Sequence, residues 1–458
     1  MLDRRHFLRM AAATSAFGAG AGMFPHALTA HAATTGGYKA LVCVFLFGGL
    51  DSHDLLLPYD TESYSSFQNV RQSLLNGYGE SRDRAQLLPL APDNAADFGS
   101  RQFALPPEMP QVKGLFDDGR AAIVANVGPL LEPVTAQAFR DGSARVPSRL
   151  FSHNDQQSTW QASAPEGAQL GWGGLFADAA IASGAEARFS ALSMAGVGPF
   201  LTGNVASPYQ VSLSGSAGIT ALQNDNAAFA DFLASAEDRF RAEGFDGTHI
   251  LERDMANLFR TGIDTNSVFD AARGGAVPLA TAFPESPLGS QLRAVAETIS
   301  IRGALNASRQ IFFVGTGGFD THSNQAFDLP GLMTQIDGAL AAFDAAMTEL
   351  GVSQDVTAFT ASDFGRTLAV NGDGTDHGWG GHHIVVGGAV RGRNIFGDVP
   401  EARLGNAADG GGGRLVPSLS VEQLADPLGR WWGLSEAEVA TALPNLRNFD
   451  PAGLDLFV

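Results

Sequence analysis

The sequence predicts an α/β protein with a mostly parallel central sheet and helices on both of its faces. Three observations predict this class. Apolar runs of strand length recur along the chain, amphipathic segments of helical period lie between them, and glycine- and aspartate-rich turns follow several of the runs. Strands that are apolar on both faces are typical of a covered sheet, and strand–helix–strand order favours right-handed crossovers.

The chain begins with a predicted export signal of the twin-arginine type, residues 1–32. Arg4 and Arg5 precede a short Gly/Ala-rich apolar stretch, and "AHAA" offers a cleavage site between small residues. The stretch is too short and too rich in glycine to span a bilayer stably. We therefore expect residues 33–458 to be exported folded by the twin-arginine machinery to the periplasm or the exterior.

The charge and the cysteine content of the chain argue against one class of partner and against internal disulfides. The formal net charge is −19, and the basic signal leaves the mature chain more acidic still. Such acidity argues against nucleic acid as a partner. Cys43 is the single cysteine, so no disulfide can form within the chain, and its apolar neighbours predict a buried side chain.

Four apolar runs predict strands of the central sheet. Three of these runs are followed at once by an aspartate, namely Asp51, Asp320 and Asp363. The runs lie in residues 40–47, 121–128, 309–320 and 355–365. Ligands of such sheets bind outside the carboxyl ends of the strands, where these aspartates fall.

Helical patterns occupy much of the remaining chain. They lie in residues 107–119, 225–244, 290–305 and 331–351. Residues 196–285 are richer in Gly, Ser, Ala and Asn and interrupt the strand–helix alternation. We therefore expect residues 33–458 to form a single domain in which residues 196–285 are an inserted helical cap that determines the substrate.

Histidines and carboxylates gather in four segments beside the predicted strand ends. Six of the seven histidines of the mature chain lie in glycine- or acid-rich stretches. The segments are "GGLDSHD" with Asp51, His53 and Asp54, "GGFDTH" with Asp320 and His322, "TASDFGRT" with Asp363 and Arg366, and "GTDHGWGGHH" with Asp376 and His377. Aspartate and glycine also populate ordinary turns. Four such segments together favour a metal or anion site, because converging carboxylates need a cation.

A fifth segment, "RLFSHNDQQSTW", offers groups for catalysis. Ser152 is a candidate nucleophile, or equally the cap of a helix that starts near Asn154. His153 is a candidate acid or base. Arg366 would hold an oxygen of the transferred group or pair with an aspartate.

The end of the fourth segment predicts a strand. His382 and His383 begin the run "HHIVVGGAV", so their side chains point to opposite faces and at most one faces the site. Trp379 would either pack in the core or form a wall of the pocket, and we favour the core.

These motifs resemble the DUF1501 family. The resemblance rests on the twin-arginine leader and on "FLFGGLDSHDLLLPYD", "LFSHNDQQSTWQ", "GGFDTHSNQ", "FTASDFGRTLAVNGDGTDHGWGGHH" and "LPNLRNFD", which together span nearly all of the mature chain. That family is grouped with the alkaline phosphatase superfamily. The resemblance implies an alkaline phosphatase-like three-layer sandwich and metal-assisted hydrolysis or transfer of phosphate or sulfate esters.

The resemblance also implies roles for individual residues. It implies one or two divalent ions, zinc, manganese or similar, held by Asp51, Asp320, His322, Asp363 and His377, with Ser152 as the nucleophile. Phe364 stands where the superfamily has a histidine ligand. His53, His153 or His382 would replace that ligand, or the site binds one metal. A formylglycine sulfatase is not expected, because Cys43 lacks the sequence context for that modification.

The leading expectation is an exported metal-dependent hydrolase of phosphate or related esters, such as sulfates or phosphonates. Its substrate would be a small molecule or a polymer. The alternative is a catalytically weak or inactive alkaline phosphatase-like protein that serves as a periplasmic or cell-surface binding or assembly factor. Phe364 and the uncertain nucleophile favour this alternative.

Overall fold

A computed structural model describes residues 37–213, 215–216, 250–451 and 453–458. The predicted export signal and the predicted helix at 225–244 lie outside the described residues. Among the helices that are described, none combines the length and the apolarity needed to cross a membrane.

The described chain alternates strands and helices. The strands are β1 (Lys39–Leu46), β2 (Leu57–Pro58), β3 (Leu88–Pro89), β4 (Phe103–Leu105), β5 (Ala121–Gly128), β6 (Ala191–Ser193), β7 (Tyr209–Ser212), β8 (Gly215–Ser216), β9 (Arg309–Thr316), β10 (Val356–Ser362), β11 (Arg366–Val370), β12 (Thr375–His377), β13 (Gly381–Gly387), β14 (Ile395–Phe396) and β15 (Leu419–Ser420). The helices are α2 (Ser52–Leu55), α3 (Thr61–Tyr78), α4 (Pro110–Asp117), α5 (Ala136–Arg140), α6 (His153–Ala162), α7 (Trp172–Ala182), α9 (Ile250–Gly274), α10 (Pro287–Ser300), α11 (Gln325–Glu349), α12 (Val421–Trp432) and α13 (Glu436–Ala442).

The main sheet is mixed but mostly parallel, as the sequence predicts. Its order is β14-β5-β13-β10-β1-β9-β6-β7-β8, with β15 also paired to β5. The centre, from β10 through β1, β9 and β6 to β7, is parallel, whereas β13 runs antiparallel between β10 and β5. All four predicted strands are present as β1, β5, β9 and β10.

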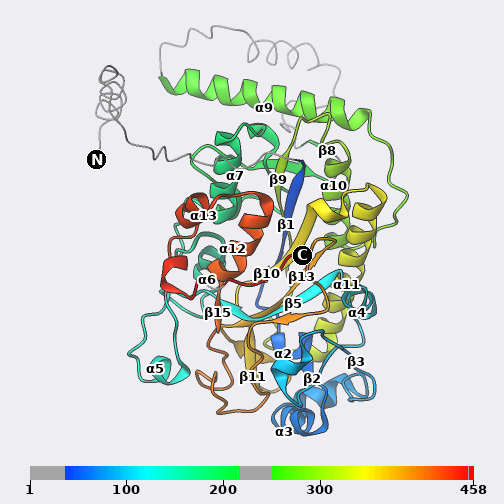
Figure 1. The fold of residues 1–458 in the computed structure, drawn as a ribbon, viewed down its shortest axis with the longest axis vertical. Coiled ribbons are helices and arrows are strands. Elements are labelled where there is room, and N and C mark those ends of the chain that lie inside the picture. The colour runs from blue at the N-terminus through cyan, green and yellow to red at the C-terminus, as the bar shows by residue number, and fades with distance from the viewer. Residues whose placement is uncertain (1–36, 214, 217–249, 452) are drawn as a thin grey trace, which may run out of the picture. The chain divides into compact units, whose positions relative to one another are not determined.

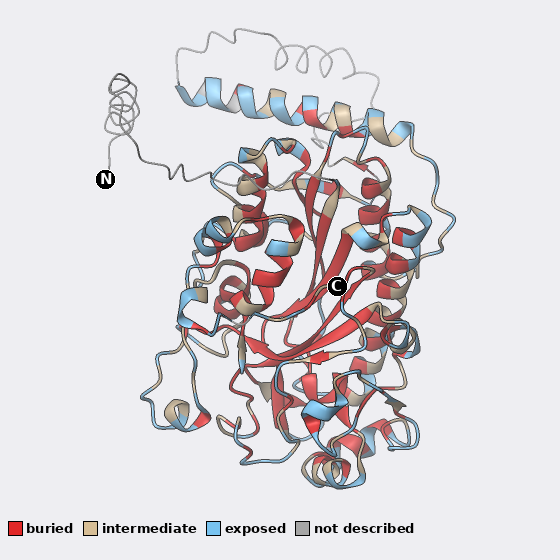
Figure 2. Cartoon of the chain, viewed as in Figure 1, coloured by how far each residue is buried: buried red, intermediate tan, exposed pale blue. Residues whose placement is uncertain are grey.

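Helices cover both faces of this sheet, which makes a three-layer sandwich (Figure 1). Val42 and Val44 of β1 pack into one apolar cluster with α4, α10 and α11. Cys43 and Phe45, which point the opposite way, pack into a second cluster with α7, α12 and α13. The central strands are buried along nearly their whole length, with half-buried residues at the start of β1 and the end of β9 (Figure 2). Each buried Val or Phe side chain contributes about 1.5–3 kcal/mol to this packing.

The three central parallel strands end level with one another. Leu46, the last residue of β1, pairs with Thr316 of β9 on one side and with Ser362 of β10 on the other. The segments that follow these three ends carry Asp51, Asp320 and Asp363. Strand pairing thus gathers residues separated by about three hundred positions at one edge of the sheet.

Helix α11 begins earlier than the sequence predicts. The expected helix spans 331–351, but the observed one starts at Gln325 and contains Pro330. Pro330 is the sixth residue of the helix, so its missing N–H costs the helix one backbone bond, the one to the carbonyl of residue 326. The early start places Gln325 beside Asp51, to which its Nε2 donates at 2.6 Å.

The described part of residues 196–285 is not purely helical. It contains β7 and β8, which extend the main sheet, and α9. Phe269 of α9 packs against Phe189 and Tyr209, which lie at the amino ends of β6 and β7. In the described chain, α9 therefore covers the end of the sheet opposite to the carboxyl ends of β1, β9 and β10 (Figure 1).

Candidate metal centre

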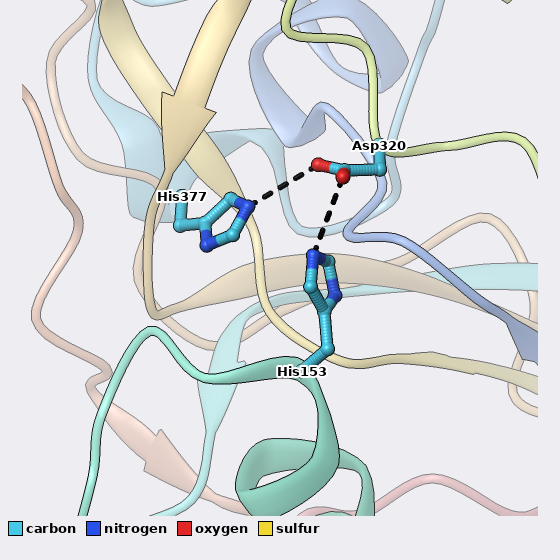
Figure 3. A group of neighbouring side chains, drawn as sticks. All are labelled: His153, Asp320 and His377. Carbon is cyan, nitrogen blue, oxygen red and sulfur yellow. Dashed lines mark hydrogen bonds and ion pairs between the residues drawn. The ribbon is translucent and has the colours of Figure 1, made fainter.

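Asp320 lies just beyond the end of β9, between His153 and His377 (Figure 3), and a third histidine, His322, also faces its carboxylate. Its Oδ1 lies 3.1 Å from Nε2 of His322 and 3.2 Å from Nε2 of His377, and its Oδ2 lies 3.4 Å from Nε2 of His153. The Nε2 atoms of His322 and His377 are 2.8 Å apart. One ligand atom from each of His153, Asp320 and His377 lies within 4.8 Å of the others.

The far nitrogens of the histidine rings fix how these rings face Asp320. Nδ1 of His153 lies 2.6 Å from a carboxylate oxygen of Asp363, and Nδ1 of His377 lies 2.8 Å from the carbonyl oxygen of Phe151. Both partners accept hydrogen bonds, so Nδ1 is the donor in each ring. A neutral ring then turns its Nε2 lone pair toward Asp320, which is the usual arrangement of metal-ligating histidines.

The charges around Asp320 fit a divalent cation. Burial raises the pKa of Asp320, but the hydrogen bond and the charge of Arg366 outweigh burial and hold that pKa below its usual value. Burial lowers the pKa of His377, although its bond to the Phe151 carbonyl works the other way. A carboxylate that faces imidazole lone pairs needs a proton or a metal ion between them. Nitrogen and oxygen donors of this kind suit zinc, manganese and similar ions.

A hairpin brings His377 to this position. Arg366 of β11 pairs across the hairpin with His377 of β12, so the two side chains are neighbours. The turn between the strands packs onto the backbone of Thr321 and His322. A Cβ at Gly374 would lie only 2.4 Å from the carbonyl oxygen of Thr321, so the approach of His377 to His322 requires glycine there.

The segment before α6 also helps to position the histidines of the site. Phe151 has φ of +75°, a rare conformation for a residue with a side chain. Its carbonyl oxygen accepts from His377, and His153 begins α6 two residues later. Arg414 braces both groups, because it donates to the His377 carbonyl at 2.9 Å and lies over the Phe151 ring.

Arg366 is paired with an aspartate, one of the two roles left open by the sequence. Its buried guanidinium donates to Asp320 Oδ1 at 2.8 Å and to the Gly48 carbonyl at 3.0 Å. It also donates to the side chain and the carbonyl of Thr375. Arg366 therefore positions the Asp320 carboxylate and offsets part of its charge.

The sequence predicts that Asp51 binds the metal, but in the structure its carboxylate is bound by other side chains. Arg71 of α3 donates to both of its oxygens, at 2.5 and 3.0 Å, and Gln325 donates to one of them. Burial raises the pKa of Asp51, but Arg71 reverses the effect and lowers it. Asp51 is 1% exposed. With this buried pair satisfied, the structure does not bring Asp51 into the group around Asp320.

Asp363 also lies behind the histidines rather than among them. Its Oδ2 accepts from His153 and, at 2.8 Å, from Nε2 of Gln157, and it is fully buried. The bond from His153 to Asp363 raises the pKa of that imidazole, in spite of partial burial. Gln157 was missed by the sequence reasoning. The four-residue spacing from His153 on a helix is the signal that places both side chains on one face.

Ser152 occupies the N-cap position of α6, but its hydroxyl does not cap the helix backbone. The hydroxyl instead donates to the carboxylate of Asp155 at 2.8 Å. The Ser152 hydroxyl, which precedes His153 in the sequence, is therefore held by a hydrogen bond to a carboxylate.

Phe364 fills space between the site histidines. Its ring centroid lies 4.9 Å from that of His153 and 4.5 Å from that of His377. Of the three histidines expected to substitute for a ligand at this position, His153 is the one brought beside Asp320. His53 and His382 are buried elsewhere and line a small separate cavity.

The two histidines of β13 behave as the strand pattern predicts. His382 accepts from the backbone N–H of Asn126, whereas His383 packs edge-on against Trp160. Trp379 is buried in an apolar cluster and donates to the Pro129 carbonyl, which confirms its structural role.

Comparison with known proteins identifies the family. The family model described as a protein of unknown function, DUF1501, matches residues 38–411. The chain belongs to the DUF1501 family. No curated protein matches the sequence.

Two solved structures resemble this DUF1501 protein weakly. One is Ps i-CgsB in complex with k-i-k-neocarrahexaose, with 10% identity over 91% of this chain and 77% of that chain and a TM-score of 0.32. The other is the PsFucS1 sulfatase from Pseudoalteromonas sp., with 11% identity over 92% and 71% of the two chains and a TM-score of 0.30. Both likenesses are too low to indicate an activity or a substrate.

Proposed function

We propose that this DUF1501 protein is an exported hydrolase of phosphate or sulfate esters that depends on a divalent metal ion. The observation that carries the proposal is the arrangement of nitrogens around Asp320. His153 and His377 donate from Nδ1 to fixed oxygens and turn Nε2 toward the Asp320 carboxylate, and His322 presents its Nε2 to the same carboxylate. The ester class rests on the resemblance of the sequence motifs, and export rests on the predicted twin-arginine leader.

Asp320, His322 and His377 would hold the ion. Their three donor atoms are the tightest set in the cluster, with separations of 2.8–3.2 Å. Three protein ligands leave a position open for substrate, as in catalytic zinc sites. The ion would supply Lewis-acid stabilisation of charge on the ester oxygens.

The remaining side chains have separate tasks. His153 lies slightly farther from Asp320 and can hold or deliver a proton at Nε2, while Asp363 and Gln157 fix its ring. Arg366 keeps the Asp320 carboxylate in place. Ser152 is the proposed nucleophile, and its hydroxyl would have to leave Asp155 to attack.

A binding or assembly protein is the second candidate. The observation that favours it is the ion pair of Arg366 with Asp320, which already satisfies part of the carboxylate charge without a metal. The hydrogen bond from the Ser152 hydroxyl to Asp155 also favours the binding or assembly protein, because it occupies the proposed nucleophile.

Metal content and turnover separate the two candidates. Protein purified without chelator should contain about one divalent ion per chain, and hydrolysis of p-nitrophenyl phosphate or sulfate should stop with EDTA and return with zinc or manganese. The ion should also raise the free energy of unfolding by about 2.7 kcal/mol at a concentration one hundred times its Kd. The binding protein would be favoured if the chain holds no ion, and if added metal causes neither a thermal shift nor turnover.

Variants assign the roles. Asp320→Asn and His322→Ala should lose the ion, whereas His153→Ala should keep it and lose turnover. Asp328→Asn, an exposed aspartate on the first turn of α11, is the matched control and should change neither. Ser152→Ala with unchanged turnover would exclude Ser152 as the nucleophile.

A further inference from the structure

A separate cavity adjoins the candidate metal centre through a shared side chain. It has a volume of about 300 Å³ and lies between α6, the loop after α6 and the segment that follows β6. Gln157 lines it and at the same time donates to Asp363, which holds the ring of His153. The cavity therefore lies beside the proposed reacting centre, at the low end of the size range of small-molecule pockets.

The polar groups of this cavity are mostly neutral. Amide and hydroxyl side chains line one wall, namely those of Asn154, Gln157, Ser158 and Gln161. An amide offers both a donor and an acceptor and so matches hydroxyl groups, which do the same. Phe47 and Phe313 add apolar surface on the strand side.

Among the described residues that line the cavity, the one charged residue is acidic. Glu166 lines the cavity and is exposed, and Asn154 lies 3.5 Å from its carboxylate. None of the described residues that line the cavity is a lysine or an arginine. A second anionic group on a ligand would thus meet a like charge with no cation to offset it.

We infer that this cavity receives the alcohol part of the ester, and that it selects an uncharged group with hydroxyls over an anionic one. This inference rests on the proposed function. Val197, Gly198 and Pro199 form part of the wall, so the start of the 196–285 segment takes part in the selection.

The test uses two phosphate esters that differ in the charge of the leaving alcohol. Glycerol 3-phosphate releases neutral glycerol, and 3-phosphoglycerate releases an anion of similar size. We expect kcat/KM to favour glycerol 3-phosphate by at least about fivefold, because one like-charge contact near the surface has an effect of this order. Glu166→Gln should reduce the ratio, and Glu62→Gln, an exposed glutamate of α3, should leave it unchanged. The matching sulfate esters replace these substrates if only sulfates are turned over.

A binding measurement keeps this inference separate from the proposed function. Saturation-transfer NMR on the metal-free mature chain should show stronger contact with glycerol than with glycerate, and Glu166→Gln should narrow the difference. Equal signals, or a preference for the anion, would overturn the inference even if esters are hydrolysed. Absence of ester turnover together with the expected NMR preference would reject the proposed function and leave the selectivity of the cavity standing.

Discussion

At the scale of single residues, partners decide what each aspartate does. Asp51, Asp320 and Asp363 follow three neighbouring strands, and the sequence predicts the same role for all of them. The structure separates them: Asp51 is paired with Arg71, Asp363 lies behind His153, and only Asp320 lies among imidazole nitrogens. Sequence reasoning could locate these aspartates because glycine and aspartate mark strand ends. It could not assign their partners, because Arg71 lies on a helix that begins in a polar segment and gives no sign of being buried.

Asp51→Asn tests this separation. The change should leave Arg71 buried without its full counter-charge and lower the free energy of unfolding by about 3 kcal/mol, while the metal content stays unchanged. Thermal unfolding and elemental analysis measure the two effects. Loss of the ion with unchanged stability would show instead that Asp51 is a ligand. Asp328→Asn serves as the control for both measurements.

At the scale of elements, the fold followed the apolar patterns closely. The runs that predict β1, β5, β9 and β10 are continuous and bounded by glycine, and α4 and α10 have clear helical periods. The prediction from the sequence is wrong where the local preference of a residue competes with packing. Pro330 marks a helix start by its local preference, yet α11 begins five residues earlier, where Gln325 reaches Asp51.

The glycine-rich loop after β14 has a measurable role in the candidate metal centre. Arg414 at its end donates to the carbonyl of His377 and packs on Phe151, so it positions a ligand without touching the ion. Arg414→Met should weaken metal binding about tenfold, as expected for groups that orient ligands. Competition with a metal-binding dye measures the Kd. Arg403→Met, which removes an exposed arginine that is paired with Glu401, should leave the Kd unchanged.

At the scale of the whole molecule, buried histidines make stability depend on pH. Burial lowers the pKa of His383 to about 3, that of His382 to about 4 and that of His53 to about 3. The unfolded chain has histidine pKa values of about 6.5, so between these values it binds more protons than the folded protein does. The free energy of unfolding should therefore fall as the pH drops below about 6.5.

His383→Phe isolates one of these contributions. Between about pH 6.5 and 5, the free energy of unfolding of the wild type should fall by about 2 kcal/mol more than that of the variant, because the variant takes up one fewer proton when it unfolds. Urea unfolding at several pH values measures the difference, and the values at pH 8 correct for altered packing against Trp160. Parallel pH profiles for the two proteins would contradict the assignment.

The level ends of β1, β9 and β10 have a consequence for the order of folding. The proposed ligands Asp320 and His377 lie 57 positions apart, and β9, which places Asp320, pairs with β1 270 positions earlier, so no local piece of chain can assemble them. Contacts of such long range form slowly and late. Metal uptake in a stopped-flow refolding experiment should therefore lag behind the gain of helical signal. An ion retained by the protein would then indicate that these long-range strand pairs had already formed.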